Sequence, residues 1–547
     1  MSYKQKIQSE IKNAVNGLAV EIIVEKPRQK EHGDAATNIA MVLAKSQKKN
    51  PLDIANEIKE KLKANTTLIS SIDIAKPGFL NFTVSDSALI ESLMDVYTLR
   101  ENYGYVQNEV KEKILVEYVS ANPTGDLHLG HGRQAVIGSC LVNLLSKAGY
   151  KLSSEFYIND YGEQIAKLSE TSWAIYEKSN GKEVIWSEDF YPEEGISPYV
   201  KKVLEKASLP ITKEELGEKV KAFILESQKE LLSSCQVTFD QWFSETSLHK
   251  NKAVEEVLKR LKEKNVTYEK EGALWFKAEE FGDVRDRVLI RSDKRPTYLL
   301  ADIAYHIDKI NRGFKKLVTV WGADHHGQEV SLKGGLKALG YDSEILEIVF
   351  VQLVSLKQHG QEVKMSKRAG TVITVDEVLS EVGPDAFRYF LIESHSNNRM
   401  VFDIDLAKKQ DKDNPVYYIQ YAHARCCSIF RQYKELNPEE KFDFDNPELL
   451  INLLKVDKEE RSATKDLILK ILDFPEEVVL AAKNRAPNRI ANYLKELAGD
   501  FHQFYTICRV ITKDPNLTKS RLALVEALEI TISNGLCILG ITAPESM

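Results

Sequence analysis

Ile114-Leu115-Val116-Glu117-Tyr118-Val119 is a β-rich run that leads through Ala121-Asn122-Pro123-Thr124-Gly125-Asp126-Leu127-His128-Leu129-Gly130-His131 into a helix expected from His131 to about Lys147. A strand, a loop and a helix in this order predict one unit of a parallel sheet. With 11 His and 27 Gly in the chain, the pattern H-x-G-H is expected by chance only about 0.01 times. The stretch therefore predicts both a fold class and the place of a functional site.

Further strand-then-helix units follow along the chain. A strand at 316–321 precedes a helix near 325–338, and a strand at 346–354 precedes a lysine-rich loop. This alternation predicts an α/β protein with a doubly wound, Rossmann-like parallel sheet. We assign residues 113–375 to this core, with an insertion at about 170–290.

The segment before the core looks like a small α+β domain at 1–85, followed by a connector at 86–112. Strand-like stretches at 71–75 and 79–84 and a helix at 35–47 support that domain.

Beyond about residue 375 the strand signal disappears and helical periodicity dominates. The expected helices lie at 415–434, 449–472, 475–511 and 516–540. We therefore expect an all-α domain at 376–547.

Composition excludes several classes of protein. Of 547 residues, 43% are hydrophobic and 28% are charged, which is typical of a globular protein and excludes a disordered or fibrous chain. The N-terminus is polar and lacks the apolar segment of a signal peptide, and no uninterrupted apolar run reaches the ~18 residues that cross a bilayer. We expect a cytoplasmic protein with no membrane partner.

Charge and cysteines limit the partners further. The 74 Lys and Arg against 81 Asp and Glu give a net charge of −7, so a nucleic acid must dock on a local basic patch. The six cysteines contain no C-x-x-C pair, which argues against a structural zinc site.

The two histidines of the opening stretch lie where an open α/β sheet binds its ligands, outside the carboxyl ends of the strands. The N-terminus of the following helix offers unpaired N–H groups to a phosphate, and His128 and His131 add imidazole donors. Gly130 leaves room for a flat base against the backbone. Two surface histidines beside a turn are the alternative interpretation.

A second polar loop follows the last predicted strand: Lys364-Met365-Ser366-Lys367-Arg368-Ala369-Gly370. Two lysines three positions apart on a loop, Lys364 and Lys367, can close over a nucleotide triphosphate and neutralise the charge that develops on a leaving pyrophosphate. A solvated loop is the alternative when this stretch is taken alone.

Together the two stretches resemble the HIGH and KMSKS motifs of class I aminoacyl-tRNA synthetases, and their surroundings resemble arginyl-tRNA synthetases of the bacterial type. The resemblance rests on four further segments: Glu117-Tyr118-Val119-Ser120-Ala121-Asn122-Pro123-Thr124-Gly125; His32-Gly33-Asp34 with Pro77-Gly78-Phe79-Leu80-Asn81-Phe82; Tyr417-Tyr418-Ile419-Gln420-Tyr421-Ala422-His423-Ala424-Arg425; and Asn534-Gly535-Leu536 with Leu539-Gly540-Ile541.

The resemblance implies ligation of L-arginine to tRNA(Arg) in two steps, by way of arginyl-adenylate. ATP is then a substrate that arrives with Mg²⁺, the 2′-hydroxyl of the terminal ribose is charged first, and tRNA is needed even for activation. It also implies a monomer, a tRNA contact by the domain at 1–85 and anticodon binding by the helical domain. The ATP-binding residues carried over are His128, Gly130, His131, Lys364, Met365, Ser366 and Lys367, of which the two histidines and two lysines are the catalytic set.

An arginine pocket must satisfy a planar guanidinium, which calls for carboxylates in fork geometry and an aromatic hydroxyl or face. Tyr298 and Asp302 are i, i+4 on an expected helix, so they share one face. The resemblance implies that Glu117, Tyr298 and Asp302 take the guanidinium. It also implies that Ser120 and Asn122 hold the amino-acid end.

Two positions depart from the family pattern. Arg368 stands where the KMSKS motif has its final serine. In Trp321-Gly322-Ala323-Asp324-His325-His326-Gly327-Gln328, Gly327 stands where a glutamine for the α-amino group is expected, which leaves Gln328, His325 or neither for that task.

A local basic stretch at 481–521 is the expected tRNA surface, with Arg485 and Arg489 contacting phosphates and Tyr421 stacking on an unpaired base. A solvated helical face and core tyrosines are the alternatives. Two other functions remain open: a tRNA-binding paralogue without catalysis, and a class I synthetase for another amino acid.

Overall fold

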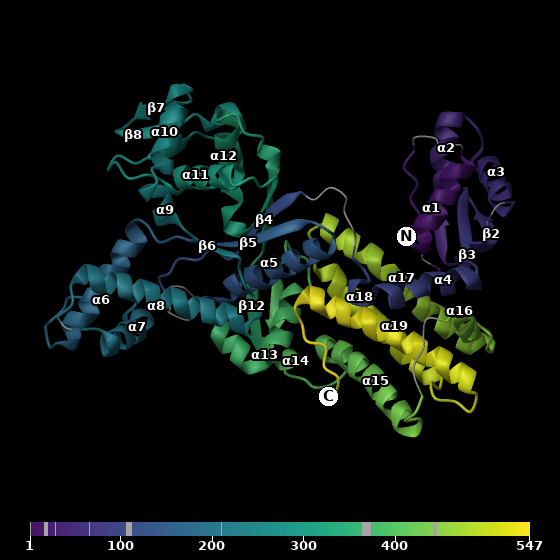
Figure 1. Cartoon of the computed structure of the whole chain (residues 1–547). Helices are drawn as coiled ribbons and strands as arrows, with labels where there is room; N and C mark the ends of the chain where they lie inside the picture. Colours follow the sequence, from purple (N-terminus) through teal and green to yellow (C-terminus); the bar gives the residue numbers. More distant parts are fainter. Residues whose placement is uncertain are drawn as a thin grey trace.

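The computed structural model describes residues 2–15, 20–27, 29–64, 66–105, 112–208, 210–363, 373–440 and 446–547. Figure 1 shows a small N-terminal domain beside a bundle of long C-terminal helices, and a central sheet that carries two further units. The central sheet is the part that positions the functional site.

The central sheet has five parallel strands in the order β11-β10-β4-β5-β6. Their bounds are β4 Lys113–Glu117, β5 Lys151–Ile158, β6 Gln241–Ser244, β10 Lys316–Gly322 and β11 Leu346–Val351. The chain builds outward from β4 through β5 to β6, then returns to the other side of β4 with β10 and β11. This is a doubly wound sheet, as predicted, and the buried run Ile114-Leu115-Val116 is apolar because both of its faces are covered.

The helices that connect these strands cover the two faces of the sheet. They are α5 Leu129–Lys147 after β4, α11 Tyr298–Asn311 before β10, and α12 His326–Ala338 after β10. The predicted helices at 131–147 and 325–338 are therefore present.

The predicted single insertion at 170–290 is divided by β6, which pairs with β5 and belongs to the central sheet. The first unit is a helical hairpin with an added helix: α6 Glu163–Ser179, α7 Glu193–Lys206 and α8 Lys213–Ser234. The second unit holds α9 Glu245–Lys250, α10 Ala253–Glu263 and an antiparallel sheet of β7 Thr267–Lys270, β8 Ala273–Phe276 and β9 Arg287–Ile290. A strand of four residues is too short to show periodicity, which is why the sequence did not predict β6.

Two expectations near the second loop are wrong. The predicted strand at 346–354 ends at Val351, and a new strand, β12 Val354–Gln358, enters a different sheet with β13 Gln361–Val363 and β14 Met400–Asp403. β14 also lies in the region where no strand was expected. Its pairing with β12 is a long-range contact that a run of four residues does not reveal.

The N-terminal domain is a three-stranded antiparallel sheet in the order β1-β3-β2, covered by helices. Its elements are α1 Tyr3–Ala14, β1 Ala35–Thr37, α2 Ile39–Gln47, α3 Pro51–Lys63, β2 Ile69–Ala75 and β3 Phe79–Val84. Residues 35–37, expected to be helical, form β1 against β3. Gly33 has φ +86°, and a Cβ there would lie 2.6 Å from the Phe82 carbonyl oxygen, so the turn before β1 requires glycine.

The C-terminal region is helical, with α13 Val375–Ile392, α14 Ile404–Ala407, α15 Pro415–Leu436, α16 Pro447–Leu450, α17 Lys458–Lys483, α18 Asn488–Ile507 and α19 Pro515–Leu539. The break predicted at 473–474 is wrong, because α17 continues through Pro475 and ends at Lys483. Buried Phe474 packs against Tyr103 and Tyr493, and this packing outweighs the local cost of proline.

Helix α4, Asp86–Leu99, leads from the N-terminal domain to the helical bundle, and the two are joined by buried contacts. Lys4 Nζ lies 2.9 Å from Asp473 and 2.8 Å from Glu476, and the Tyr97 hydroxyl donates to the Ala523 carbonyl. Within the described residues, α19 is the one helix long and apolar enough to span a membrane, and 78% of its apolar window is buried in the bundle. It is therefore a core helix of this domain.

Candidate active site

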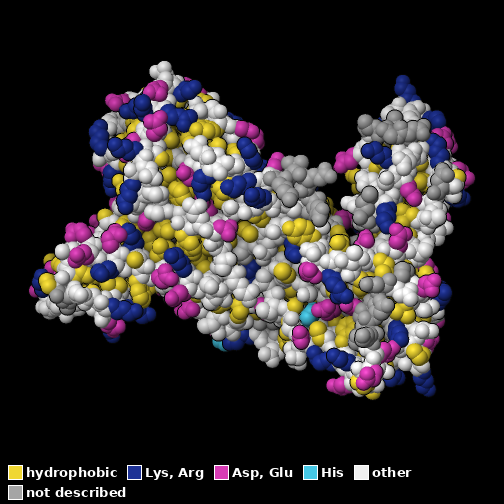
Figure 2. Space-filling view, viewed as in Figure 1, with side chains coloured by type: hydrophobic (Ala, Val, Ile, Leu, Met, Phe, Trp, Pro, Cys, Tyr) yellow, Lys and Arg dark blue, Asp and Glu magenta, His cyan; other side chains and the backbone are white. Residues whose placement is uncertain are grey.

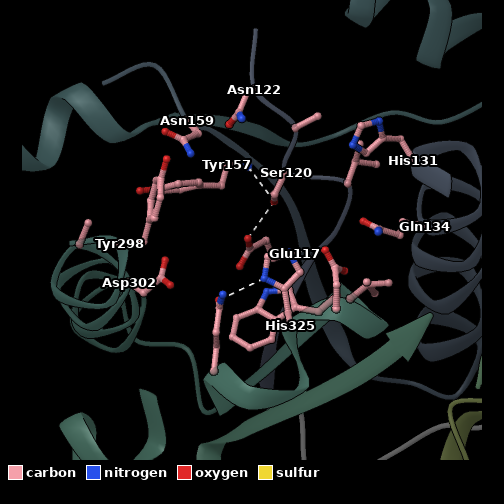
Figure 3. A pocket seen from close by; sticks show the side chains of 18 of the residues that line it. Glu117, Ser120, Asn122, His131, Gln134, Tyr157, Asn159, Tyr298, Asp302 and His325 are labelled. Carbon is pink, nitrogen blue, oxygen red and sulfur yellow. Dashed lines mark hydrogen bonds and ion pairs between the residues drawn. The ribbon is translucent and has the colours of Figure 1, made fainter. Parts of the chain in front are cut away.

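A cavity of about 420 Å³ opens at the carboxyl ends of β4, β5 and β10, where a doubly wound sheet binds its ligands. Predicted residues from both halves of the site line it: Glu117, Ser120, Asn122, His128, His131, Tyr298, Asp302, His325 and Gln328. In Figure 3, Tyr298 and Asp302 stand on one side of this cavity and His131 on the other. The structure thus brings together residues as far apart in the chain as Glu117 and Gln328.

His128 and His131 orient each other at the start of α5. The Nδ1 atom of each ring accepts the backbone N–H of the other residue at 3.3 Å, which is a reciprocal capping box made of two histidines. The rings stack with centroids 3.6 Å apart. Because Nδ1 accepts a hydrogen bond, the ring proton lies on Nε2, so each neutral imidazole presents an N–H donor, as phosphate binding requires.

Gly130 packs directly beside the His128 ring. A Cβ at this position would lie 3.0 Å from Cε1 and 3.1 Å from Nδ1 of His128, so glycine lets the stacked ring keep its place. The predicted clearance for adenine at Gly130 stays a prediction.

The second lysine-bearing stretch lies outside the described residues, and so do the predicted Lys364, Met365, Ser366, Lys367 and the divergent Arg368. Ile373 is the first described residue after this stretch, and its carbonyl accepts a hydrogen bond from the Leu129 N–H at 3.2 Å. Val375 N–H donates in turn to the Leu127 carbonyl at 2.8 Å. The chain that follows the second signature is therefore hydrogen-bonded to the loop that carries the first.

Tyr298 and Asp302 share one face of α11 and point into the cavity, as their spacing predicted. Burial raises the pKa of the Asp302 carboxyl to about 7, and the negative charge of Glu117 adds to the shift. A carboxyl with this pKa is ready to lose its proton when a cation arrives.

Glu117 lines the cavity but already has a cationic partner. Its Oε2 lies 2.5 Å from Lys309 Nζ, and both side chains are buried. Ser120 Oγ donates to Glu117 Oε1 at 2.8 Å. Glu117 therefore contacts both Lys309 and Ser120 in the structure, and the direct contact with a guanidinium that the resemblance implied stays a prediction.

Glu245 is a candidate site residue that the sequence did not reveal. It is buried at the start of α9, and its Oε2 has no hydrogen-bond partner within the described part of the chain. Burial raises its pKa to about 7, with a further contribution from the charge of Asp302. Glu245 lines a neighbouring cavity of about 280 Å³ that shares Tyr298 and Ala301 with the first cavity. Glu245 directly follows β6, a strand of the central sheet that the sequence did not predict. Recognising β6 would have placed Glu245 at the carboxyl edge of the sheet.

Ser120 and Asn122 lie on a tight turn at the end of β4. Val119 and Ser120 have φ of +72° and +48°, so two successive non-glycine residues are left-handed, a conformation that concentrates at functional sites. Ser120 Oγ accepts the Tyr157 N–H at 3.3 Å, and the Asn122 amide donates to the Gln164 side chain. The turn presents both residues to the middle of the cavity.

Both residues left open for the amino group, His325 and Gln328, are in the cavity wall. His325 Nδ1 lies 3.1 Å from Gln328 Oε1, so the two side chains are hydrogen-bonded to each other. They act as one polar unit at the end of β10.

The predicted tRNA residues of the helical domain divide into two groups. Arg485 is ion-paired with Glu347 of β11 at 3.0 Å, and Arg489 with Glu477 at 2.8 Å. Arg485 thus links the helical domain to β11 and Arg489 links α18 to α17, and the assignment of both to tRNA phosphates stays a prediction. Figure 2 shows Lys and Arg side chains interspersed with Asp and Glu over the face drawn.

Tyr421, by contrast, belongs to an exposed cluster of rings. The Arg425 guanidinium lies 5.4 Å from the centroid of Tyr421 and 5.2 Å from that of Tyr505. His502 stacks on Tyr421 at 5.8 Å, and both tyrosines are 36% exposed. We call Tyr421, Arg425, His502 and Tyr505 the aromatic cluster.

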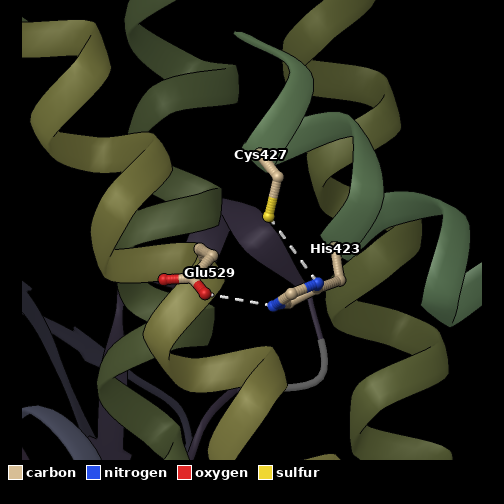
Figure 4. Close-up of side chains that lie close together, drawn as sticks. All are labelled: His423, Cys427 and Glu529. Carbon is tan, nitrogen blue, oxygen red and sulfur yellow. Dashed lines mark hydrogen bonds and ion pairs between the residues drawn. The ribbon is translucent and has the colours of Figure 1, made fainter. Parts of the chain in front are cut away.

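His423, Cys427 and Glu529 are the one group of metal-ligating side chains, among the residues described, whose ligand atoms lie within 4.8 Å of one another (Figure 4). His423 Nε2 lies 3.0 Å from Glu529 Oε1, and Nδ1 donates to the Pro544 carbonyl at 2.9 Å. Burial lowers the pKa of His423, but hydrogen bonds to Cys427 and Glu529 outweigh it and raise the pKa to about 10. An imidazolium with both nitrogens engaged explains this cluster, and the expectation of no zinc stays a prediction.

Three family descriptions match successive parts of the chain. "Arginyl tRNA synthetase N terminal domain" matches residues 1–84, "tRNA synthetases class I (R), catalytic domain" matches 95–422, and "DALR anticodon binding domain" matches 419–547.

Individual relatives agree with these matches over the full length. An arginine–tRNA ligase of Halalkalibacterium halodurans is 44% identical over 559 aligned residues, which cover 100% of this chain and 99% of the relative. An arginine–tRNA ligase of Bacillus subtilis is 43% identical over 561 residues with the same coverage. The solved Thermus thermophilus arginyl-tRNA synthetase has a TM-score of 0.78 at 22% identity over 100% of both chains, which supports the fold.

Proposed function

The chain belongs to the arginyl-tRNA synthetase family, and from this premise we propose how its residues divide the work of the reaction. Its activity is arginine–tRNA ligation, with ATP as a substrate. The carboxylate of arginine attacks the α-phosphate of ATP to form arginyl-adenylate and release pyrophosphate. A ribose hydroxyl of tRNA then attacks the carbonyl of the adenylate, which forms the arginyl ester and releases AMP. No residue needs to form a covalent intermediate, so catalysis is positioning and charge stabilisation.

The observation that carries the proposal is a pair of buried carboxyls, Asp302 and Glu245, that have no lysine or arginine ion-pair partner among the described residues. Burying two uncompensated carboxyls is costly unless a cationic ligand completes the site. A guanidinium is planar and presents several donors, so it suits two carboxylates beside the Tyr298 hydroxyl. Asp302, Glu245 and Tyr298 are therefore our guanidinium-binding residues.

We assign the amino-acid end of arginine to Ser120 and Asn122, with the His325–Gln328 unit near the α-amino group. Glu117, neutralised by Lys309, holds Ser120 in place through its 2.8 Å hydrogen bond. Support comes from Figure 3, where Ser120 lies between Tyr298 and Asp302 on one side and His131 on the other. The cavity is also lined by Glu117, Asn122, His325 and Gln328.

At the nucleotide end, His128 and His131 donate from Nε2 to phosphate oxygens, and Gly130 faces the base. Lys364, Met365, Ser366 and Lys367 remain proposed ATP contacts on the strength of their motif. Mg²⁺ is proposed to arrive on the ATP phosphates, because imidazoles and amides dominate the described wall here and suit phosphate better than a hard cation.

For tRNA, we propose that the aromatic cluster stacks on unpaired bases of the anticodon loop, since tyrosine and arginine planes are stacking surfaces for single-stranded RNA. The N-terminal domain at 1–85 is the proposed second tRNA contact. The domain bounds 113–375 and 376–547 and a cytoplasmic location are proposed from the sequence pattern and composition, and a monomeric state is proposed from the family alone.

The test is pyrophosphate exchange with each of the twenty amino acids, with and without total tRNA. Exchange with arginine alone, and only when tRNA is present, is the expected result. Exchange with another amino acid would overturn the pocket assignment but keep the synthetase class. The absence of exchange under every condition would favour a tRNA-binding paralogue without catalysis.

A further inference from the structure

Arg388 of α13 is fully buried and has no carboxylate partner among the described residues. Its Nε donates to the Leu539 carbonyl at 2.8 Å, and Nη1 donates to the carbonyls of Cys235 at 2.9 Å and Gln236 at 3.2 Å. Nη2 donates to Ser139 Oγ at 2.7 Å. One guanidinium on α13 thus contacts three other segments that are distant in the sequence.

Two of these segments are the C-terminal ends of helices, α8 at Cys235 and α19 at Leu539. The last carbonyls of a helix lack intrahelical partners and carry a partial negative charge, so they suit a cation. The guanidinium supplies donors to both helix ends at once, which explains how its charge is held without a carboxylate. A lysine has the charge but lacks the planar fork.

The other contact is to the helix that begins with the histidine pair. Ser139 lies on α5, whose first turn carries His128 and His131. Helices α5 and α19 are also bonded directly, since Cys140 Sγ donates to the Leu539 carbonyl at 3.3 Å and Asn143 Nδ2 donates to the Ile538 carbonyl at 3.2 Å. The C-terminal end of α19 therefore contacts α5 in two ways, through the shared guanidinium of Arg388 and through direct hydrogen bonds between the two helices.

We propose that Arg388 is a positioning residue that holds α5 against the C-terminal end of α19, so that the placement of His128 and His131 depends on how the helical domain is seated. The proposal rests on the function proposed above for these histidines. Binding of tRNA to the helical domain then changes the affinity for ATP through this contact, and ATP changes the affinity for tRNA by the same factor.

Arg133 is the matched control, because it is also a fully buried arginine without a carboxylate partner in the described chain, and it lies on α5 itself. Its guanidinium donates to the carbonyls of Gln352 at 2.9 Å, Asn398 at 2.7 Å and His395 at 3.1 Å. These acceptors all precede α15, so Arg133 supports α5 without contacting α19.

The experiment measures the ATP Kd of the full-length protein with and without saturating tRNA, together with the tRNA Kd and the kcat per titrated active site. Arg388→Lys should reduce the ratio of the two ATP Kd values by about tenfold and lower kcat, while the tRNA Kd measured without ATP stays near wild type. Arg133→Lys should weaken ATP binding equally with and without tRNA.

Ser139→Ala covers the case in which Arg388→Lys does not fold, since it removes the shorter of the two α5 contacts of Arg388, leaves the 3.5 Å contact to Cys140 Sγ, and leaves both helix ends bound. It should reduce the ratio in the same direction by a smaller factor, and Ser146→Ala, an exposed position on the same helix, should leave it unchanged. A wild-type ratio of one, or variants that lower only the melting temperature, would overturn the proposal. Failure of the proposed function would instead appear as wild-type protein that does not exchange pyrophosphate with arginine.

Discussion

Lys309 Nζ lies 2.5 Å from Glu117 Oε2 in the floor of the cavity, and the two side chains are 0% and 6% exposed. Removing one member of a buried ion pair leaves the other charged and uncompensated, which costs about 3–5 kcal/mol. Lys309→Met should therefore destabilise β4 by that amount, and Glu117→Gln combined with Lys309→Met should recover most of the loss. Native-state hydrogen exchange of the β4 amides measures it locally. A loss below about 1 kcal/mol for the single variant would contradict a structural ion pair.

Because Asp302 and Glu245 are assigned to the guanidinium of arginine, we predict that Asp302→Asn and Glu245→Gln each weaken arginine binding. Truncating one partner of a buried, hydrogen-bonded charge pair costs about 2–5 kcal/mol, so the KM for arginine should rise at least about thirtyfold. The KM for ATP should stay near wild type, because the nucleotide end is on the other side of the cavity. Glu163→Gln, at the exposed rim of the neighbouring cavity, is the control and should change neither constant. An unchanged arginine KM in Glu245→Gln would remove that residue from the pocket.

The same two carboxyls predict a pH dependence of arginine binding. Their pKa values are raised to about 7 in the free protein, and guanidinium binding requires both ionised. Arginine affinity should therefore be full above pH 7 and fall as the pH drops below it, while ATP affinity follows a different profile.

The stability of the free protein should change with pH in the opposite direction. A raised carboxyl pKa stabilises the folded state at low pH, and this contribution is lost as pH rises through 7. Calorimetric titrations of arginine across pH 5.5–8 test the first part, and a flat profile would contradict it.

Two substitutions of His128 distinguish its structural role as a helix cap from its proposed catalytic role as a hydrogen-bond donor. His128→Asn keeps a side-chain acceptor at a helix N-cap, where asparagine is favoured, but removes the imidazole donor. The melting temperature should stay near wild type, while the exchange rate should fall about 10²–10³-fold, as for loss of one donor to a developing charge. His128→Ala should lose both stability and rate. Equal rates for His128→Asn and wild type would show that only the cap matters.

The aromatic cluster and the ion-paired arginines give opposite expectations for tRNA. Tyr421→Ala should weaken tRNA binding by about 1–3 kcal/mol, because a stacking contact with a base is lost. The salt dependence of binding should change little, because no contact with a phosphate is lost. Arg489→Gln should change the tRNA Kd little if Glu477 is its main partner. If it instead lowers affinity and flattens the salt dependence, the phosphate contact predicted from the sequence is correct. Filter binding at several salt concentrations distinguishes the two.

Local patterns in the sequence were sufficient for the architecture. The run from Ile114 through His131 predicted the first strand, its loop and the helix, and the later alternation predicted a doubly wound sheet, which the strand order confirms. Among the elements that local patterns missed, β6 and β14 are four residues each and exist because a distant strand pairs with them. The predicted helix break before Pro475 was wrong because buried packing around Phe474 outweighs a local signal.

For the site, motif and spacing placed His128, His131, Tyr298 and Asp302 in one cavity, but the state of each charge was decided by tertiary contacts. Glu117 is paired with Lys309, 192 positions away, and Glu245 lines the neighbouring cavity because it directly follows β6, which pairs with β5. A sequence specifies which groups are present and their local period. Whether a carboxylate is available to a ligand depends on which charges and dipoles the fold places within a few ångströms of it, and those neighbours are set by long-range packing.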